Sequence, residues 1–322
     1  MSAHIGRKQA IGIGKEITAG TKVSASIWLA KTSGVMQPMI ETLQDTQGYW
    51  VIDEVYDVQP IKEHTELSVE GTISDLSFWF ILLSALGTAG VSGSGPYTHA
   101  FTRNNTNSHQ SFTVWWYDPV ATWSSAFAML NSLEISAVAG EYATFKMDMI
   151  GKKTVTESTP SVSYASENLF RARDCKVYIA DTEAGLASAT AIPINSITLK
   201  IEKNLYVHQN IGTLDIDSIY NQQLNVSGEF EGLFTAKTYQ DFVRNGTKKY
   251  MKIELINTDV TLTPSGNPTI SITLAKVWFE SWEQGSDNND IIKETVWFIG
   301  AFNNTDGYTI KASMINSRST VY

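Results

Sequence analysis

Glu66-Leu67-Ser68-Val69-Glu70-Gly71 is a stretch in which apolar and polar side chains alternate up to a glycine, and a helical pattern ending at Gly87 follows it. A second stretch, Gln223-Leu224-Asn225-Val226-Ser227-Gly228, repeats this order and leads to a helical pattern ending at Gly246. Each copy predicts a strand with one dry face, a short bend and a helix with a glycine stop. We therefore expect the same unit twice in the chain.

The two predicted helices differ in their surroundings. The first, residues 76–86, is apolar on almost every side, which is typical of a helix buried on more than one face. Ser74 or Asp75 is expected to cap its N-terminus. The second, residues 236–244, has one apolar and one polar face. We predict that the tail 301–322 or another subunit covers the first helix, and that the second faces solvent.

Length and composition place limits on the function. A chain of 322 residues has room for about two domains. The formal net charge of −9 argues against a general nucleic-acid-binding surface and against docking on anionic lipid. The single cysteine, Cys175, is expected to be a half-buried strand residue. Residues 1–6 contain no apolar signal core, and the longest apolar run is well below the ~20 residues that span a bilayer. These features predict a soluble protein made in the cytoplasm.

Strand and turn patterns predict a mainly β chain. We expect a first unit over 1–155, a linker over 156–168, a second unit over 169–300 and a C-terminal tail over 301–322. Residues 31–49 are interpreted as a loop, and a strand is expected from Tyr49 to Val58. Residues 87–112 are interpreted as a long exposed excursion. Each unit is expected to close with a hairpin, at 132–149 in the first and 269–298 in the second.

A catalytic set is not evident in the sequence. None of the five histidines lies in a metal-binding motif, Gly12 and Gly14 lack the context of a phosphate loop, and no serine nucleophile motif occurs. We therefore expect no catalytic residue, no cofactor and no metal. One alternative is a glycosidase with Glu134 and Asp148 as its acid pair.

Aromatic residues leave a second alternative open. Trp115, Trp116 and Trp123 can form a sugar-stacking platform, which would make the chain a carbohydrate-binding or adhesin-type β-sandwich protein of a virion. Large aromatic residues equally dominate cores and subunit interfaces. The β-rich doubled unit, the acidic charge and the missing chemistry favour a protein that contacts copies of itself.

Short motifs in order along the chain resemble one family, the tail tube or major tail proteins of long-tailed bacteriophages. The resemblance begins with Gly12-Ile13-Gly14-Lys15-Glu16 and continues through Val69-x-Gly71, Leu86-Gly87 and Tyr97-x-His99-x-Phe101. It ends with Asn131 to Ile135, Gly140-Glu141 and Glu294-Thr295-Val296-x-Phe298. Each motif is short, and it is their order over nearly the whole chain that carries the likeness.

The resemblance implies two similar β-sandwich or barrel units, each flanked by one short α-helix. It implies a structural virion protein that self-assembles into stacked rings, which form the tail tube through which DNA passes without specific binding. Members with one unit form hexameric rings and members with two form trimeric, pseudo-hexameric rings, so the doubling favours the trimer over the hexamer. The implied partners are copies of itself and other tail proteins, with no membrane, and the implied location is the virion tail after synthesis in the host cytoplasm.

Two sets of residues are candidates for this assembly. An acidic lumen would repel the DNA backbone, and the candidate lumen acids are Glu134, Glu141, Asp148, Glu280 and Glu283. The candidate subunit-contact residues are Phe78, Trp79, Phe80, Tyr97, Phe101, Phe302, Tyr308 and Tyr322. Contacts along the tube axis are expected from residues 31–49, 88–110 and 301–322.

Overall fold

A computed structural model of the protein describes residues 4–285, 288 and 290–319. The chain is mainly β, as predicted, and the described part contains two α-helices. The elements of the first half are η1 (Gly6–Lys8), β1 (Ala10–Lys15), β2 (Ile27–Leu29), β3 (Ser33–Asp45), β4 (Asp57–Thr72), α1 (Phe78–Leu86), β5 (Gly87–Ser92), β6 (Tyr97–Arg103), β7 (Phe112–Tyr117), β8 (Thr122–Val138), β9 (Thr144–Gly151) and β10 (Val155–Thr156).

The second half begins after an extended segment that follows β10. Its elements are η2 (Ala172–Asp174), β11 (Cys175–Ala180), η3 (Ala184–Ala187), β12 (Ser196–Glu202), β13 (Tyr206–His208), β14 (Ser218–Tyr220), β15 (Asn225–Leu233), α2 (Thr238–Asn245), β16 (Lys248–Ile256), β17 (Thr269–Gly285), β18 (Lys293–Gly300) and β19 (Ile310–Asn316).

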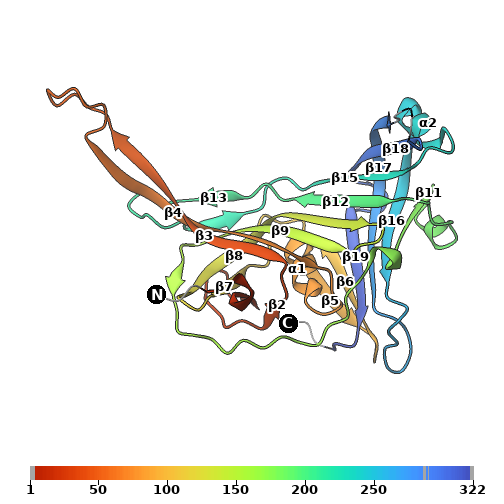
Figure 1. The fold of residues 1–322 in the computed structure, drawn as a ribbon, viewed down its shortest axis with the longest axis horizontal. Helices are drawn as coiled ribbons and strands as arrows, with labels where there is room; N and C mark the ends of the chain where they lie inside the picture. Colours follow the sequence, from red (N-terminus) through yellow and green to blue (C-terminus); the bar gives the residue numbers. More distant parts are fainter. Residues whose placement is uncertain (1–3, 286–287, 289, 320–322) are drawn as a thin grey trace.

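Eight strands form one continuous antiparallel sheet across the molecule, in the order β3-β4-β9-β8-β12-β15-β18-β17 (Figure 1). Strands β8 and β17 are long and continue beyond this sheet. The first part of β8 pairs with β7, which pairs with β1, and the first part of β17 pairs with β16, which pairs with β11. The other edge of β17 leads through β19 and β6 to β5. We call the eight-stranded sheet the main sheet.

The same five pairings occur in both halves of the chain. The pairs β1–β7, β7–β8, β8–β9, β4–β9 and β3–β4 in the first half have the counterparts β11–β16, β16–β17, β17–β18, β15–β18 and β12–β15 in the second. Strand β8 is irregular at Asn131, and β17 is irregular at Glu280, where each meets the next strand of its hairpin. The division into two units stays a prediction, and these repeated pairings support it.

The register of the sheet aligns the two halves differently from the sequence repeat. Gly71 lies opposite Phe145 and Gly228 lies opposite Phe298, and in both places a backbone oxygen and the ring together leave no room for a Cβ atom. When the halves are aligned on their bulges, however, the position of Gly71 corresponds to Gly232. The sequence match is therefore shifted by four residues, which keeps every side chain on its expected face because strands have a period of two.

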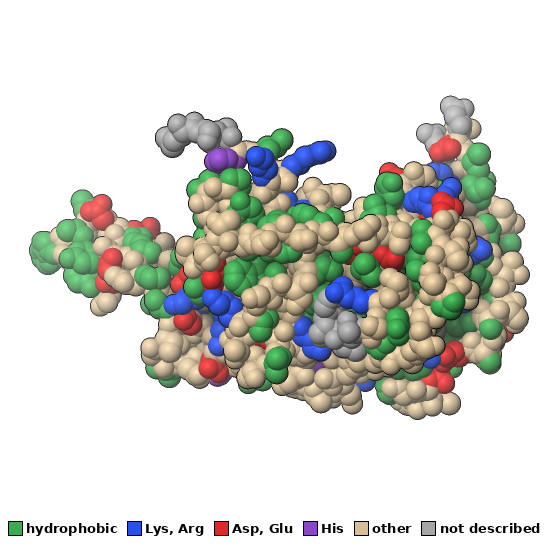
Figure 2. All heavy atoms as spheres, turned by 90° about the horizontal axis from the view of Figure 1, so that it is seen from below, with side chains coloured by type: hydrophobic (Ala, Val, Ile, Leu, Met, Phe, Trp, Pro, Cys, Tyr) green, Lys and Arg blue, Asp and Glu red, His purple; other side chains and the backbone are tan. Residues whose placement is uncertain are grey.

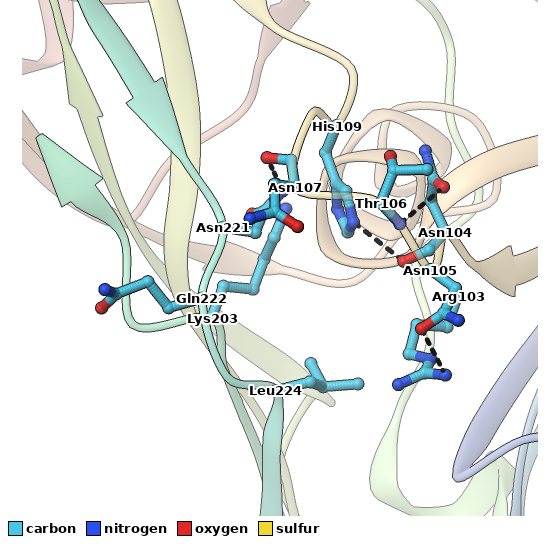
Figure 3. A pocket seen from close by; sticks show the side chains of 10 residues that line it. All are labelled: Arg103, Asn104, Asn105, Thr106, Asn107, His109, Lys203, Asn221, Gln222 and Leu224. Carbon is cyan, nitrogen blue, oxygen red and sulfur yellow. Dashed lines mark hydrogen bonds between the residues drawn. The ribbon is translucent and has the colours of Figure 1, made fainter. Parts of the chain in front are cut away.

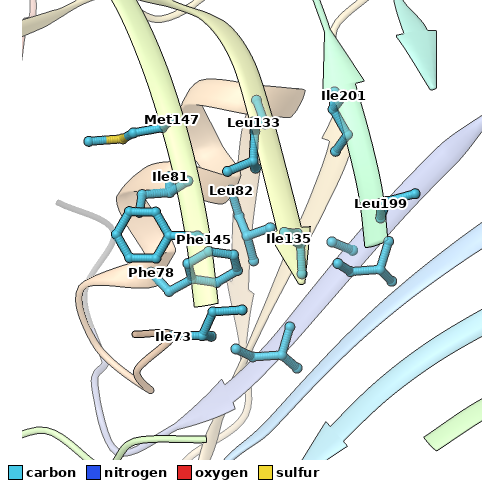
Figure 4. Packing of buried hydrophobic residues seen from close by; sticks show 14 of the residues in the cluster. Ile73, Phe78, Ile81, Leu82, Leu133, Ile135, Phe145, Met147, Leu199 and Ile201 are labelled. Atoms are coloured by element: carbon cyan, nitrogen blue, oxygen red, sulfur yellow. The ribbon is translucent and has the colours of Figure 1, made fainter. Parts of the chain in front are cut away.

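Helix α1 is completely buried, as its composition predicted (Figure 4). Its side chains Phe78, Ile81 and Leu82 face the main sheet, where Phe145 of β9 lies with its ring centroid 5.8 Å from that of Phe78. The apolar cluster continues through β8 to β12 and so joins both halves. Full burial of each large apolar side chain contributes roughly 1.5–3 kcal/mol, so this cluster is the main source of stability.

The C-terminal strand covers the first helix, which confirms one of the two covers predicted. Strand β19 pairs with β6 from Lys311 to Asn316, and α1 contacts both strands. Asn316 at the end of β19 donates a hydrogen bond from Nδ2 to the backbone oxygen of Asp75, just before the helix (2.8 Å). Helix α2 has no buried residue, in agreement with its one-sided pattern.

The predicted C-terminal ends of the two helices are correct, but the predicted N-terminal cap of α1 is wrong. Gly87 and Gly246 both adopt left-handed φ angles, 89° and 60°, and end their helices as expected. Helix α1 begins two residues later than predicted, with Ser77 as its N-cap, and neither Ser74 nor Asp75 caps it. Instead the hydroxyl oxygens of Ser74 and Ser77 lie 2.6 Å apart in a hydrogen bond with each other.

Residues 31–49 correct a sequence interpretation. They hold the long strand β3, which pairs with β4 over residues 33–45 to form a hairpin that projects from the body (Figure 1). The expected strand at Tyr49–Val58 is wrong in its first part, because residues 46–56 form the tip of this hairpin. We call residues 40–63 the arm. The excursion at 87–112 also differs from prediction, since β5 and β6 form a hairpin within it.

Candidate functional site

One face of the main sheet is mostly polar, with Trp297 and Ile299 of β18 and Trp278 of β17 as its large apolar side chains in the second half. Directly opposite residues of an antiparallel pair share a face, so rows of side chains can be followed from strand to strand. One row runs from Glu70 through Lys146 and Glu134 to Lys200. The other face carries the apolar residues of the core. The sheet therefore separates a packed interior from a broad hydrophilic surface, which we call the polar face.

Carboxylates and lysines alternate along one row of the polar face, but carboxylates outnumber lysines on the face as a whole. Lys146 Nζ lies 3.4 Å from a carboxylate oxygen of Glu70, and Lys200 Nζ lies 3.2 Å from one of Glu134. Such exposed pairs contribute only about 0–1 kcal/mol each. Outside the arm, the carboxylates on this face are Glu66, Glu70, Glu134, Asp148, Glu202, Glu229, Glu231 and Glu283, and the lysines are Lys146, Lys200 and Lys293.

The five predicted lumen acids fall in three places. Glu134, Asp148 and Glu283 lie on the polar face, where Asp148 accepts a hydrogen bond from a serine hydroxyl of β8 (2.7 Å). Glu280 occupies the irregular position of β17, and Glu141 lies in the turn between β8 and β9. The structure thus brings three of them to one surface, and their exposure to a lumen stays a prediction.

The predicted subunit-contact residues divide into two groups. Phe78, Trp79, Phe80 and Phe101 are each at most 1% exposed within the single chain, so their surface is already used in its core. This corrects their assignment as contact residues, and the reason is that β19 supplies the cover they needed. The remaining four are Tyr97 and Tyr308, which are half-buried, Phe302, which is exposed, and Tyr322, which lies outside the described residues.

The two halves of the chain join by pairing of one strand from each half. Strand β12 pairs with β8 from Ser196 opposite Val138 to Glu202 opposite Ser132. Beyond β12, the backbone N–H of Asn221 donates to the oxygen of Asn107 (3.0 Å). A cavity of about 110 Å³ remains between these segments (Figure 3). We call this contact between the halves the junction.

Lys203 is buried at the junction, directly after β12. Its Nζ donates a hydrogen bond to the backbone oxygen of Ser84 (2.7 Å), one of the last carbonyl groups of α1. These carbonyls lack partners within the helix and carry the negative end of its dipole. A residue of the second half therefore caps the helix of the first. Sequence reasoning missed it, since a lysine is normally exposed.

Burial lowers the pKa of Lys203 to about 7 from its ordinary value of 10.5. The unfolded chain then binds more protons than the folded chain between these two values, so this group makes stability rise as pH rises from about 7 to 10. The K203M variant removes the effect. We expect its melting temperature relative to the parent chain to fall over that pH range, by an amount that corresponds to on the order of 4 kcal/mol. A difference independent of pH would contradict this account.

A second apolar cluster lies where the chain returns after β12. Ile216 and Ile219 pack on Met129 of β8, and all three are buried. Segment 203–224, which contains the β13–β14 hairpin, thereby covers the end of the polar face in the first half. The position that corresponds to Met129 in the second half is Trp278, which is 38% exposed.

The arm carries a group of exposed apolar side chains (Figure 2). Trp50 and Ile52 at its tip are fully exposed, and Val58 is 48% exposed. The rings of Tyr49 and Tyr56 stack at 4.0 Å and close the tip. A two-stranded hairpin of this length is marginal alone in water, and exposed apolar clusters commonly mark contact surfaces. In the sequence, the signal for such a surface is Trp50 with apolar residues near it in a segment that is otherwise polar.

Two strand edges of the main sheet are open. Among the described residues, β3 pairs with β4 alone, and β17 beyond Trp278 pairs with β18 alone. Open edges promote pairing with other chains unless they are protected. Pro38 in β3 is a residue typical of such an edge, because it has no N–H to donate.

The alternative functions find little support in the geometry. Trp116 is buried, and the Nε1 atom of Trp115 donates to a backbone oxygen of the N-terminal segment (2.9 Å), so the three tryptophans do not form an open platform. Glu134 pairs with Lys200 rather than lining a cleft with Asp148. Burial raises the pKa of the half-buried Cys175 thiol to about 12, which agrees with the expected structural role.

Metal and membrane features are equally sparse in what the structure describes. No cluster of three or more His, Cys, Asp or Glu side chains among residues 4–285, 288 and 290–319 is arranged to hold a metal ion. None of the described helices is long and apolar enough to cross a membrane.

Comparison with known proteins gives one result that spans the chain. A family model described as phage tail tube protein matches residues 6–299, from the start of the first 3-10 turn into the last residues of β18. A comparison with curated proteins gave no match.

Proposed function

The chain belongs to the phage tail tube protein family, and from this premise we propose that copies of it assemble into stacked rings that form a tube for DNA. Membership makes it a structural protein of a phage tail. The observation that carries the proposal is the broad polar face bounded by two open strand edges. A sheet with these features can be extended by further copies into a closed wall whose polar face lines a channel.

We favour a ring of three chains. The repeated pairings in the two halves support units that occupy equivalent positions, so three chains would supply six units around the axis. The boundaries we propose remain 1–155 and 169–300, joined by residues 156–168. The tail 301–322 has a further role in this proposal, since β19 completes the cover of α1.

The polar face is proposed to line the channel. Its excess of carboxylates repels DNA phosphates, whereas a basic lining would bind them through counterion release. Glu134, Asp148 and Glu283 would face the lumen directly. Glu141 and Glu280, at a turn and a bulge, would lie toward its rims. DNA would then pass without specific binding.

The remaining surfaces are proposed to serve the tail as a whole. The turn at Gly93–Pro96 and residues 301–309 are candidates for contacts between successive rings and with other tail proteins. The family is a structural one, and we propose neither an enzymatic activity nor a cofactor. Synthesis in the host cytoplasm followed by incorporation into the virion tail completes the proposal.

Electron microscopy of the purified chain tests this function. At high protein concentration, alone or with the tail initiator of the same phage, negative stain should show rings and tubes of constant diameter. A chain that remains monomeric under every such condition would contradict the proposal.

A further inference from the structure

The strand edges that pair at the junction have counterparts at the two ends of the main sheet, and these counterparts are unpaired in the single chain. Aligned on their bulges, the β8–β9 and β17–β18 hairpins place Glu134 of the first at the position of Glu283 in the second. Following the pairings outward from these hairpins through β4 and β15, Lys200 of β12 corresponds to Gln37 of β3. The strands that meet at the junction, β8 and β12, therefore correspond to β17 and β3.

The corresponding edges are open in the single chain. In β8 the stretch after the bulge, residues 132–138, is occupied by β12. In β17 the stretch after the bulge, residues 281–285, has β18 on one side and no partner on the other within the described residues. Strand β3 likewise has no described partner beyond β4. Residues 281, 283 and 285 are exposed.

We propose, on the basis of the tail tube function above, that a second copy of this chain fills this edge by repeating the junction. Strand β17 of one chain pairs antiparallel with β3 of the next, and Glu283 lies opposite Gln37 as Glu134 lies opposite Lys200. The pairing is head to tail, so it uses one open edge from each chain and closes when the last copy meets the first.

The arm is the second part of this contact. Within the chain, Ile216 and Ile219 of segment 203–224 cover Met129. The offset between β4 and β15, carried back along the sequence beyond the paired residues, matches Val55 and Val58 of the arm to these isoleucines. Both valines are exposed, and so is Trp278, which corresponds to Met129. The arm of one chain therefore packs on Trp278 of its neighbour.

Charge supports a second copy as the occupant of the edge. Glu283 brings a carboxylate to the edge and Gln37 brings a neutral amide, which can donate to it. The sequence match differs from the structural register by four residues. If β3 were shifted by that amount along β17, Ser33 would lie opposite Glu283 instead. The two registers can be separated by experiment, because Ser33 and Gln37 lie on the same face of β3.

Disulfide cross-linking tests the register. The Q37C/E283C variant, concentrated and mildly oxidised, should form disulfides between chains that run as covalent oligomers on a non-reducing gel. The K200C/E134C variant is the positive control, since its two positions are directly opposite in one chain and should form an internal disulfide. The S33C/E283C variant tests the shifted register. Cys175 stays in every variant, because its half-buried thiol has a raised pKa and reacts slowly.

Each outcome decides the proposal. Cross-linked oligomers in Q37C/E283C, at a yield at least about tenfold above that of S33C/E283C, support it. Equal or greater cross-linking in S33C/E283C overturns the register, and so does a lack of oligomers in Q37C/E283C while K200C/E134C closes. Electron microscopy of the same samples separates this inference from the function: tubes without the expected cross-link overturn only the pairing, whereas neither tubes nor cross-links overturn both.

Discussion

Replacing Trp79 by alanine should lower the free energy of unfolding by about 3–5 kcal/mol, the largest effect expected from one side chain. Trp79 is 1% exposed, and its ring meets that of Phe101 edge-on with centroids 5.8 Å apart. Its Nε1 donates to Nδ1 of His99 (3.0 Å), so the proton of His99 is on Nε2, which lies 2.9 Å from Oδ1 of Asn316. The substitution opens a cavity and leaves a buried acceptor without its donor.

Two further variants make this prediction specific. Trp79→Phe retains most of the packing but not the donor, and should cost about 1–3 kcal/mol less than the alanine variant. Phe302→Ala removes an aromatic ring that is 43% exposed and should change stability by much less. Urea unfolding of the unassembled chain measures all three. If Trp79→Ala were as stable as Phe302→Ala, the buried contacts of Trp79 would not contribute to stability as we expect.

Replacing Val55 and Val58 together by lysine should prevent assembly without unfolding the chain. The valines are 38% and 48% exposed, so the free energy of unfolding should change by only about 0.5 kcal/mol per site. If they pack on Trp278 of a neighbour, the loss of apolar burial and the burial of charge should weaken the contact by about 3 kcal/mol. This raises the protein concentration needed for tube formation roughly a hundredfold.

The matched control places the same charges elsewhere. Ile17 and Val120 are 97% and 78% exposed and lie far in sequence from the arm. The I17K/V120K variant should form tubes at nearly the concentration of the parent chain, as measured by light scattering and checked by microscopy. Equal inhibition by both double variants would indicate an effect of net charge rather than of the arm.

Sequence patterns predicted those elements whose two faces differ in environment. Helix α1 was identifiable because its apolar surface needs burial on every side, and the same argument anticipated a cover such as β19. The strands of the main sheet alternate between core and polar face, which gave the hairpins at 132–149 and 269–298. Local chemistry alone also identified the glycines that end the two helices.

The arm and the junction escaped prediction for a physical reason. Strand β3 is exposed on both faces over most of its length, so it lacks the alternation that marks a half-buried strand. Trp50 and Ile52 are typical of strands, yet they lie fully exposed at the tip, where they contact no core that would have set their pattern. The contact of Lys203 with Ser84 joins residues far apart in sequence and depends on the tertiary fold.

The number of chains in one ring tests the central claim most directly. Single rings released from tubes can be weighed by native mass spectrometry. If two units per chain occupy equivalent places around the axis and the junction is repeated between chains, the mass should be three times the 35.6 kDa of the chain. A ring of six chains would contradict this account, because each chain would then supply only one position.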